Sequence, residues 1–206
     1  MSAHRQLWTP TSNSTVEQVI LVDRDDAPIG VSEKQDAHVR GRLHRAFSIF
    51  TFDSGGRILL QRRAASKYHS GGLWSNTCCS HPRPGEATAA AAQRRLFEEM
   101  GFDCPLTPAF SLIYRADVGG GLIEHEYDHV FVGTFDGEPA PDPHEVDACR
   151  WLHPRDIERE LSQHPDRYTY WFRVAWTELK ARGLCRTRVV SGEYDPERAI
   201  ECSRGA

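Results

Sequence analysis

The sequence predicts a single α+β domain in which a mixed, mostly antiparallel sheet is flanked by helices. Short apolar runs between turn residues indicate strands in the first half, an alanine-rich segment indicates a central helix, and helical patterns close the chain. With 206 residues, of which 39% are hydrophobic, the chain can bury one sizeable core.

The first half of the chain is predicted to consist mainly of strands. A short apolar strand covers residues 19–22, and the turn residues of 25–30 lead to a second strand. Strands at 46–52 and 57–62 flank the sequence Asp-Ser-Gly-Gly, which is typical of a hairpin. A further strand is predicted at 73–79.

The clearest predicted helix covers residues 86–100. It is rich in alanine, follows Pro-Gly and stops at Gly101. Arg95, Glu98 and Glu99 lie together on one of its faces, by the spacing of neighbours on a helix. Four side chains at helical spacing are predicted to face the core: Ala89, Ala92, Leu96 and Met100.

The second half continues with two strands and two helices. A long strand is predicted at 122–135 and a short one at 148–152, followed by helices near 154–161 and 168–182. The expected organisation has three parts: a flexible arm at 1–15, the domain at 16–183 and a tail at 184–206.

Composition argues against several classes of protein. The formal net charge of -4 gives no basic footprint for nucleic acid, and no apolar run approaches the roughly 20 residues of a membrane span. The N-terminus has no apolar signal sequence, and six cysteines, two of them adjacent, do not resemble a secreted disulfide framework. We therefore expect a cytoplasmic protein without nucleic-acid or membrane partners.

A strand with alternating acidic residues is predicted around residues 123–129. Glu124, Glu126 and Asp128 share one face, because side chains alternate along a strand. Neighbouring carboxylates repel each other unless a cation or a proton lies between them. The strand is either part of such a site or a solvated edge strand whose acidic residues face water.

Three histidines are further candidate metal ligands. His38 and His44 flank a short loop, and His81 follows the cysteine pair. Imidazoles and carboxylates together suit a divalent transition ion, or a site that tolerates magnesium or manganese. The alternative is that these are ordinary surface histidines, because the chain has 10 and lacks HExxH and CxxC spacings.

The two adjacent cysteines have different predicted environments. In an extended segment Cys79 faces the same side as His81, and Cys78 faces the other side. Cys79 is therefore the candidate thiol for a pocket, where a nearby cation favours its thiolate. Cys78 is expected to pack in the core, as free cysteines commonly do.

Basic side chains form a candidate phosphate site. Arg62 and Arg63 are followed by Lys67, and Lys34 precedes His38 by four residues. Cations near acidic metal ligands fit a phosphate that is bound through both. The alternative is a solvated basic loop, and the sequence contains neither a Walker-type loop nor GxGxxG.

Three segments extend these observations to a known family: Leu43–Ser48, Leu73–Pro82 and Ile123–Asp128. In this order they resemble the type I isopentenyl-diphosphate isomerases of the Nudix superfamily, and the likeness runs from about residue 17 to about residue 180. The resemblance implies a Nudix-like mixed sheet flanked by helices.

The chain departs from the usual Nudix signature at two positions. Ser80 occupies the first glycine position, and Arg95 replaces a glutamate. The arginine weakens the acidic magnesium cluster on which Nudix hydrolysis relies, and it adds a cation for a diphosphate. The other signature positions match: Glu86, Arg94, Leu96, Glu98, Glu99, Gly101 and Phe102.

The resemblance implies the isomerisation of isopentenyl diphosphate to dimethylallyl diphosphate by a 1,3-proton shift through a tertiary carbocation. An acid protonates the alkene, and a base removes a proton on the other side. By resemblance, Cys79 and Glu126 are these two groups. Tyr114 is the hydrogen-bond partner of the glutamate, and Trp171 stabilises the cation with its ring face.

The resemblance also implies the ligands and cofactors. One metal site, for Mn2+, Mg2+ or Zn2+, is assigned five residues: His38, His44, His81, Glu124 and Glu126. Glu99 holds a second ion, Mg2+, together with the substrate diphosphate. Four cations contact that diphosphate: Lys34, Arg63, Lys67 and Arg95. No flavin is expected, and the protein is expected to be a monomer or a weak dimer.

Two alternatives remain at this point. A Nudix hydrolase of nucleotide diphosphates would share the acidic helix but would need neither Cys79 nor the pair Glu124 and Glu126. A non-catalytic module would use the histidines for a structural metal, but structural zinc sites are usually closed sets of four ligands rich in cysteine.

Overall fold

The computed structural model describes residues 17–185, so the predicted arm at 1–15 and nearly all of the predicted tail at 184–206 lie outside the described residues. Strands and helices of this part follow one another in the order β1 (Gln18–Val22), β2 (Pro28–Glu33), α1 (Lys34–Arg40), β3 (His44–Phe52), β4 (Ile58–Arg63), β5 (Trp74–Ser75), β6 (Cys78–Ser80), α2 (Thr88–Met100), β7 (Leu106–Asp117), β8 (Ile123–Thr134), β9 (Val146–Leu152), α3 (Pro154–Gln163), a short 3-10 helix (Pro165–Arg167) and α4 (Tyr170–Ala181).

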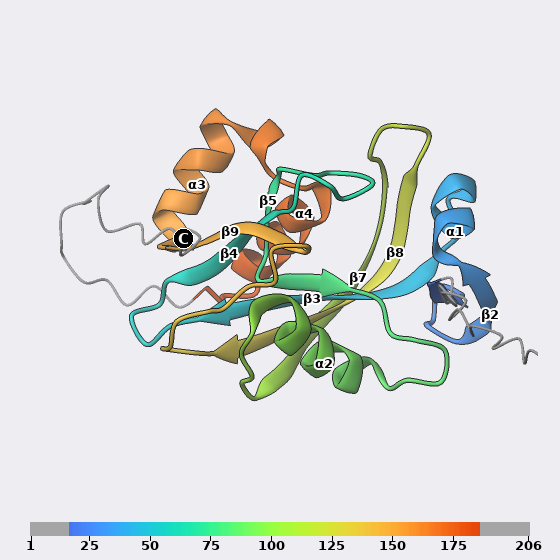
Figure 1. Cartoon of the computed structure of the whole chain (residues 1–206), viewed down its shortest axis with the longest axis horizontal. Helices are drawn as coiled ribbons and strands as arrows, with labels where there is room; N and C mark the ends of the chain where they lie inside the picture. Colours follow the sequence, from blue (N-terminus) through green and yellow to red (C-terminus); the bar gives the residue numbers. More distant parts are fainter. Residues whose placement is uncertain (1–16, 186–206) are drawn as a thin grey trace, which may run out of the picture.

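Strand β3 is the centre of a mixed sheet (Figure 1). It pairs in parallel with β8 along its whole length, from His44 opposite Glu126 to Phe52 opposite Thr134. Its other edge pairs antiparallel with β1 and with β6. The remaining strand pairs are antiparallel. The predicted α+β architecture is confirmed, and its one long parallel pair lies at the centre.

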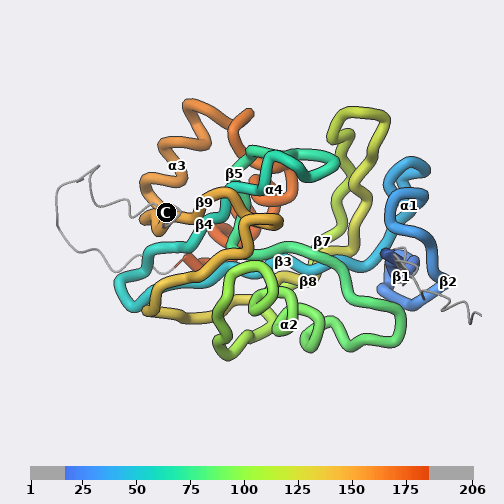
Figure 2. The backbone as a smooth tube through the Cα atoms, in the orientation of Figure 1, coloured from blue at the N-terminus to red at the C-terminus, as the bar shows by residue number. Residues whose placement is uncertain are grey.

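Helices cover both faces of this sheet. Helix α2 lies on one face, and α3 and α4 lie on the other (Figure 1). Because side chains alternate along a strand, Phe47 and Leu59 pack in the cluster that contains α2, whereas Phe50 and Leu60 pack with α4. The backbone trace places α1, β1 and β2 together at one end of the molecule (Figure 2).

Helix α2 ends as predicted. Gly101 adopts a left-handed conformation with φ 72°, and its N–H donates to the carbonyl of Phe97. A Cβ atom at this glycine would lie 2.3 Å from the carbonyl oxygen of Ala140, so only glycine fits. The predicted core stripe is wrong at Ala89, which is exposed in the first turn, and Ala91 is buried instead.

The predicted hairpin forms only at its turn. Strands β3 and β4 share a single pair, Phe52 opposite Ile58. Beyond this pair β3 continues along β8, and β4 continues along β9. The two strands therefore diverge, and the sheet opens between them.

The strand predicted at 73–79 is divided into β5 and β6. Between them, the Asn76 side chain donates to the carbonyl of Ile49, and the Thr77 hydroxyl donates to the carbonyl of Leu59. These side chains replace a regular ladder, because buried backbone groups need partners. Cys79 still follows Cys78 on an extended strand.

Helix α1 and strand β7 were not predicted, and neither was the short 3-10 helix Pro165–Arg167. Helix α1 has seven residues and no side-chain cap, so it lacks the usual start signal, and His38 lies within it and not beside a loop. Strand β7 is largely exposed over its first half and is interrupted by a bulge near Pro108. Among the described helices, none is long and apolar enough to cross a membrane.

Candidate active site

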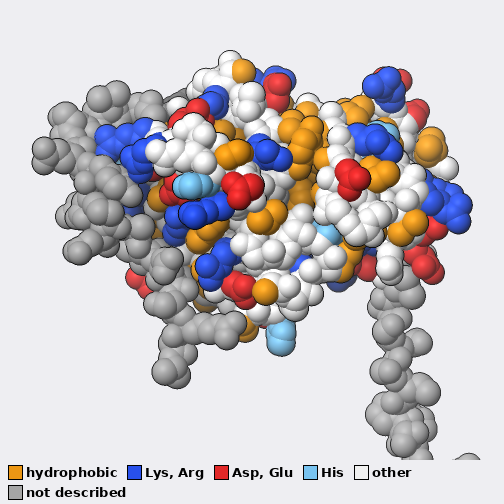
Figure 3. Space-filling view, turned by 90° about the horizontal axis from the view of Figure 1, so that it is seen from above, with side chains coloured by type: hydrophobic (Ala, Val, Ile, Leu, Met, Phe, Trp, Pro, Cys, Tyr) orange, Lys and Arg blue, Asp and Glu red, His pale blue; other side chains and the backbone are white. Residues whose placement is uncertain are grey.

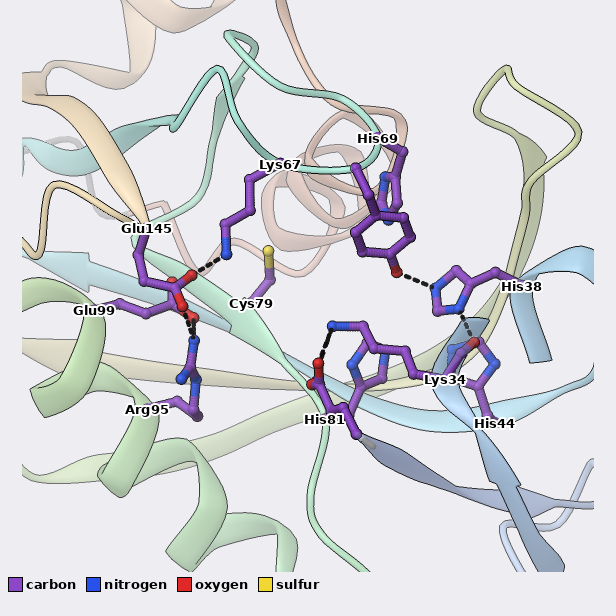
Figure 4. Close-up of polar contacts among 12 residues, drawn as sticks. Lys34, His38, His44, Lys67, His69, Cys79, His81, Arg95, Glu99 and Glu145 are labelled. Atoms are coloured by element: carbon purple, nitrogen blue, oxygen red, sulfur yellow. Dashed lines mark hydrogen bonds and ion pairs between the residues drawn. The ribbon is translucent and has the colours of Figure 1, made fainter. Parts of the chain in front are cut away.

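Most of the residues predicted to carry chemistry line one cavity of about 480 Å³, and the predicted ligands His38 and His44 are buried outside its lining. Figure 4 shows Cys79 between two groups of side chains, with histidines on one side and the Lys67, Arg95 and Glu99 group on the other. Eleven of the predicted site residues line the cavity: Lys34, Arg63, Lys67, Cys79, His81, Arg95, Glu99, Tyr114, Glu124, Glu126 and Trp171. The surface in Figure 3 carries basic and acidic side chains close together, with apolar side chains between them.

The acidic strand is buried, so the alternative of a solvated edge strand is wrong. Glu124 is 3% exposed, Glu126 is 8% exposed and Asp128 is fully buried. The predicted alternation is confirmed along β8, whose carboxylates face inward. Pairing with β3 places His44 directly opposite Glu126, which no local pattern indicated.

Two small groups of ligand atoms lie beside these carboxylates. In the first group, His38, His44, His81 and Glu126 each contribute one atom, and these atoms all lie within 4.8 Å of one another. The second group joins His38 to Glu124 and His69.

Short distances connect the imidazoles to the carboxylates. Nε2 of His81 lies 2.9 Å from Oε1 of Glu126, and Nε2 of His44 lies 3.7 Å from the same oxygen. Nε2 of His38 lies 3.2 Å from Oε2 of Glu124. The five residues predicted for this metal site are therefore brought together.

Backbone contacts orient two of the histidines. Nδ1 of His38 lies 2.6 Å from the carbonyl oxygen of Lys34, and Nδ1 of His44 lies 2.8 Å from that of Arg42. These carbonyls can only accept, so each Nδ1 donates, and Nε2 remains available as a ligand.

Several buried polar atoms in the cluster lack a hydrogen-bond partner: Nε2 of His44, Nδ1 of His81 and Oε2 of Glu124. Unsatisfied buried polar atoms are costly. Imidazole nitrogens and carboxylate oxygens with free lone pairs are also the donors that divalent ions take up. The residues therefore fit a divalent metal ion.

The pKa shifts of His81 and Glu126 are consistent with a site for a divalent ion. Burial lowers the pKa of His81 to about 4, so its imidazole is neutral at neutral pH. Burial and the charge of Glu124 both act to raise the pKa of Glu126, but the adjacent imidazoles of His44 and His81 outweigh them and lower it. A neutral imidazole and an ionised carboxylate are the forms that bind a metal.

Glu126 has a second partner on β7. The Tyr114 hydroxyl donates a hydrogen bond of 2.5 Å to Oε2 of Glu126, and the two residues are paired across the strands. Burial and the glutamate raise the pKa of Tyr114 well above its ordinary value, so the phenol keeps its proton. The contact that the resemblance implied between these residues is present.

The two cysteines face different environments, as predicted. Cys78 is fully buried in the core with α2, and Cys79 lines the cavity. Nη1 of Arg63 lies 3.9 Å from Sγ of Cys79. Burial raises the pKa of Cys79 to about 12 despite this cation, so Arg63 alone does not favour the thiolate.

The predicted phosphate-binding cations have carboxylate partners. Lys34 pairs with Glu17 at 3.1 Å, and Lys67 pairs with Glu145. Arg95 lies 2.6 Å from Glu99 and 3.2 Å from Glu145. Lys67, Arg95, Glu99 and Glu145 form a group at one end of the cavity where an anion and a cation can bind together, whereas Lys34 lies on the histidine side (Figure 4).

Two site residues were missed by sequence reasoning. His69 lies 3.0 Å from Glu124, and Glu145 bridges Lys67 and Arg95. Each is a single residue outside a regular element, with no spacing to mark it. The one available signal in the sequence is that His69 follows two residues after Lys67, a predicted site residue.

Trp171 closes the cavity opposite the sheet. Its indole N–H donates to the Ser75 hydroxyl at 2.9 Å, and the guanidinium of Arg63 lies 5.1 Å from its ring centre. The residue is 3% exposed, so its ring position is fixed. A ring held in this way can stabilise a positive charge through its face.

Comparison with known proteins identifies the family. The model of the NUDIX domain matches residues 42–174. A protein of Aromatoleum aromaticum named isopentenyl-diphosphate Delta-isomerase 2 is 57% identical over 175 residues, which cover 85% of this chain and 87% of the relative. The chain belongs to the isopentenyl-diphosphate Delta-isomerase family.

Other relatives agree with this assignment. The isopentenyl-diphosphate Delta-isomerase of Burkholderia multivorans is 58% identical over 156 residues, covering 76% of this chain and 89% of the relative. A crystal structure from Deinococcus radiodurans matches with a TM-score of 0.61 at 19% identity, covering 72% of this chain and 90% of the other. That likeness concerns the fold alone. The sequence-based assignment to this isomerase family within the NUDIX superfamily is confirmed.

Proposed function

We propose that this protein interconverts isopentenyl diphosphate and dimethylallyl diphosphate by moving one proton onto the substrate and removing another. An unactivated alkene reacts only if an acid protonates it, which leaves a tertiary carbocation. A base on the other side then removes a proton from the neighbouring carbon. The reaction needs two proton-transfer groups that reach one pocket from different sides.

The observation that carries the proposal is the placement of Cys79 and Glu126. Cys79 is paired with Ser48 on one edge of β3, and Glu126 is paired with His44 on the other edge. Both side chains line the same cavity. We assign them as the acid and the base, with Tyr114 positioning the Glu126 carboxylate.

The wall of the cavity is assigned the role of protecting the carbocation from water. Trp171 offers a ring that can stabilise the cation, and its contact with Ser75 holds the ring in place. The aromatic wall also excludes water, which would otherwise capture the cation.

The His/Glu site is assigned to a divalent ion, Mn2+, Mg2+ or Zn2+, held by His38, His44, His81, Glu124 and Glu126. When bound, such an ion neutralises the two adjacent carboxylates and tunes the proton affinity of Glu126. The protein side chains fix where that carboxylate points: His81 and Tyr114 contact its two oxygens.

The diphosphate is assigned to the opposite end of the cavity. Lys67 and Arg95 provide cations at this end, Arg63 beside Cys79 and Lys34 on the histidine side complete the four, and Glu99 would hold Mg2+ with the diphosphate. Arg95 is the feature that favours this reading over phosphate-ester hydrolysis. It stands where the Nudix signature has a glutamate, so the acidic cluster on which hydrolysis relies has one carboxylate fewer, and its guanidinium adds a cation beside Glu98 and Glu99 at 2.8 Å and 2.6 Å.

The test is incubation of the metal-loaded protein with magnesium and isopentenyl diphosphate in deuterated water. We expect dimethylallyl diphosphate that carries deuterium, without released phosphate. Released phosphate without label, from this substrate or from a nucleotide diphosphate, would favour the hydrolase instead. The Cys79→Ala variant is the matched control, because an isomerase loses its activity with this change and a hydrolase keeps it.

A further inference from the structure

Histidine 69 lies outside every element of regular structure, in the loop 64–73 between β4 and β5, and yet it is buried. Its Nε2 lies 3.0 Å from Oε1 of Glu124. The other oxygen of this carboxylate, Oε2, faces His38 and has no hydrogen-bond partner. One oxygen is therefore held by the loop, and the other is left for a ligand.

The contacts of the imidazole fix its tautomer. The ionised Glu124 carboxylate can only accept, so Nε2 of His69 carries a proton and donates to it. Nδ1 lies 3.3 Å from the Ser70 hydroxyl, which can donate to it in the neutral imidazole. Carboxylates and imidazoles next to metal ligands commonly fix ligand orientation in this way.

The loop is held by more than this one contact. The Tyr68 hydroxyl lies 3.4 Å from Nε2 of His38, and a guanidinium nitrogen of Arg63 lies 3.5 Å from the carbonyl oxygen of His69. The His69 ring meets the edges of Tyr68 and Trp171, with ring centres 4.4 Å and 5.9 Å away. The same loop carries Lys67, which reaches the other end of the cavity.

We infer that His69 is a positioning residue: it donates a hydrogen bond to Glu124 and thereby links the order of the loop 64–73 to metal binding. A metal ion favours the ionised, correctly oriented Glu124, and this carboxylate favours the ordered loop. Because such linkage is reciprocal, an ordered loop must also raise the affinity for the metal. The inference rests on the metal site assigned above, and it adds a link between that site and the diphosphate-binding end.

Two substitutions distinguish the hydrogen bond that His69 donates from the packing of its side chain. His69→Leu keeps apolar bulk but removes the donor, whereas His69→Gln keeps a donor near the position of Nε2. His164→Ala is the control, because it removes an exposed histidine outside the cavity. Circular dichroism and the unfolding midpoint establish that each variant is folded.

The first readout is binding of Co2+ to metal-free protein, followed by calorimetry and by the visible absorption of the bound ion. We expect His69→Leu to weaken binding about 10-fold or more, as loss of a ligand-orienting partner does, and His69→Gln to restore most of the affinity with an unchanged spectrum. Wild-type affinity in His69→Leu would overturn the inference. So would an equal loss in both variants with a changed spectrum, because His69 would then bind the metal itself.

The second readout is hydrogen exchange of the loop 64–73 with and without Co2+. We expect the ion to slow exchange in the wild type and in His69→Gln, and to leave it nearly unchanged in His69→Leu. An equal effect of the ion in all three proteins would overturn the link. Neither readout depends on turnover, so a failure of the isomerase assignment would be seen separately in the deuterium experiment.

Discussion

The Glu126 carboxylate is held between two partners: Oε2 accepts a 2.5 Å hydrogen bond from Tyr114, and Oε1 lies 2.9 Å from Nε2 of His81. Oε2 is thus bonded to a residue of the pocket wall, and Oε1 is in contact with the histidine cluster. This arrangement makes Glu126 the residue through which metal binding and proton transfer can influence each other.

Replacing Tyr114 by phenylalanine removes the hydrogen bond to Glu126 and little volume. A hydrogen bond to a charged group contributes about 1.5–3 kcal/mol, so we expect kcat to fall about 10- to 100-fold. KM and metal content should stay near the wild-type values in steady-state and metal analyses. Tyr127→Phe is the matched control, because Tyr127 alternates to the opposite face of β8. A variant Tyr114→Phe with unchanged kcat would contradict the assigned role.

Replacing Cys79 by alanine removes a group assigned to proton transfer. Loss of a general acid or base lowers rates about 100- to 10,000-fold, and we expect kcat to fall in this range. Cys78→Ala is the control: it leaves a small gap in the core with α2, so it should lower the unfolding midpoint and retain activity. Similar activities of the two variants would argue against a chemical role for Cys79.

Arg62 and Arg63 are adjacent in sequence but have different roles. Arg63 is 8% exposed and lines the cavity, whereas the guanidinium of Arg62 lies 5.7 Å from the Trp74 ring centre. We expect Arg63→Ala to raise KM about 10-fold or more, because a charge-assisted contact to the diphosphate is lost. Arg62→Ala should leave KM nearly unchanged, and a comparable rise in both would contradict the assignment.

Metal binding should release protons at mildly acidic pH. Burial acts to lower the pKa of His38, but the Glu124 carboxylate, 3.2 Å from its Nε2, outweighs burial and raises the pKa above 6.5. The imidazole is therefore protonated at this pH in metal-free protein, and the metal must displace that proton. His81, with a pKa of about 4, contributes no proton there.

We accordingly expect a measurable number of protons to be released per bound ion near pH 6.5, with His38 as their source. The release should fall as the pH rises through the pKa of His38 in the folded protein. Calorimetry in buffers with different ionisation enthalpies measures this number. Proton release that stays constant to alkaline pH would contradict the prediction.

Removal of the metal should destabilise the fold. The ion binds only the folded protein, and at about 100 times its Kd it adds about 2.7 kcal/mol of stability. For a chain of this size the gain corresponds to a rise in Tm of about 5–10 °C. Thermal unfolding before and after chelation measures the difference, and His44→Ala should abolish it. An equal Tm with and without metal would show that the cluster binds no ion.

The sequence by itself determined the features that depend on local periodicity. The alternation along β8 separated Glu124 and Glu126 from the residues between them, and the extended segment separated Cys79 from Cys78. The alanine-rich segment and Gly101 defined most of α2. These patterns are readable because the side-chain repeat of a strand or helix is fixed by its backbone geometry.

The tertiary structure alone decided which distant residues meet. The parallel register of β3 and β8 joins His44 to Glu126, the divergence of β3 and β4 opens the predicted hairpin, and the loop after β4 brings His69 to Glu124. Such contacts follow from the packing of whole elements, because a strand pair or a loop contact is chosen by the burial it permits and not by its own sequence pattern. Local sequence therefore supplied the chemical groups, and long-range packing arranged them into a site.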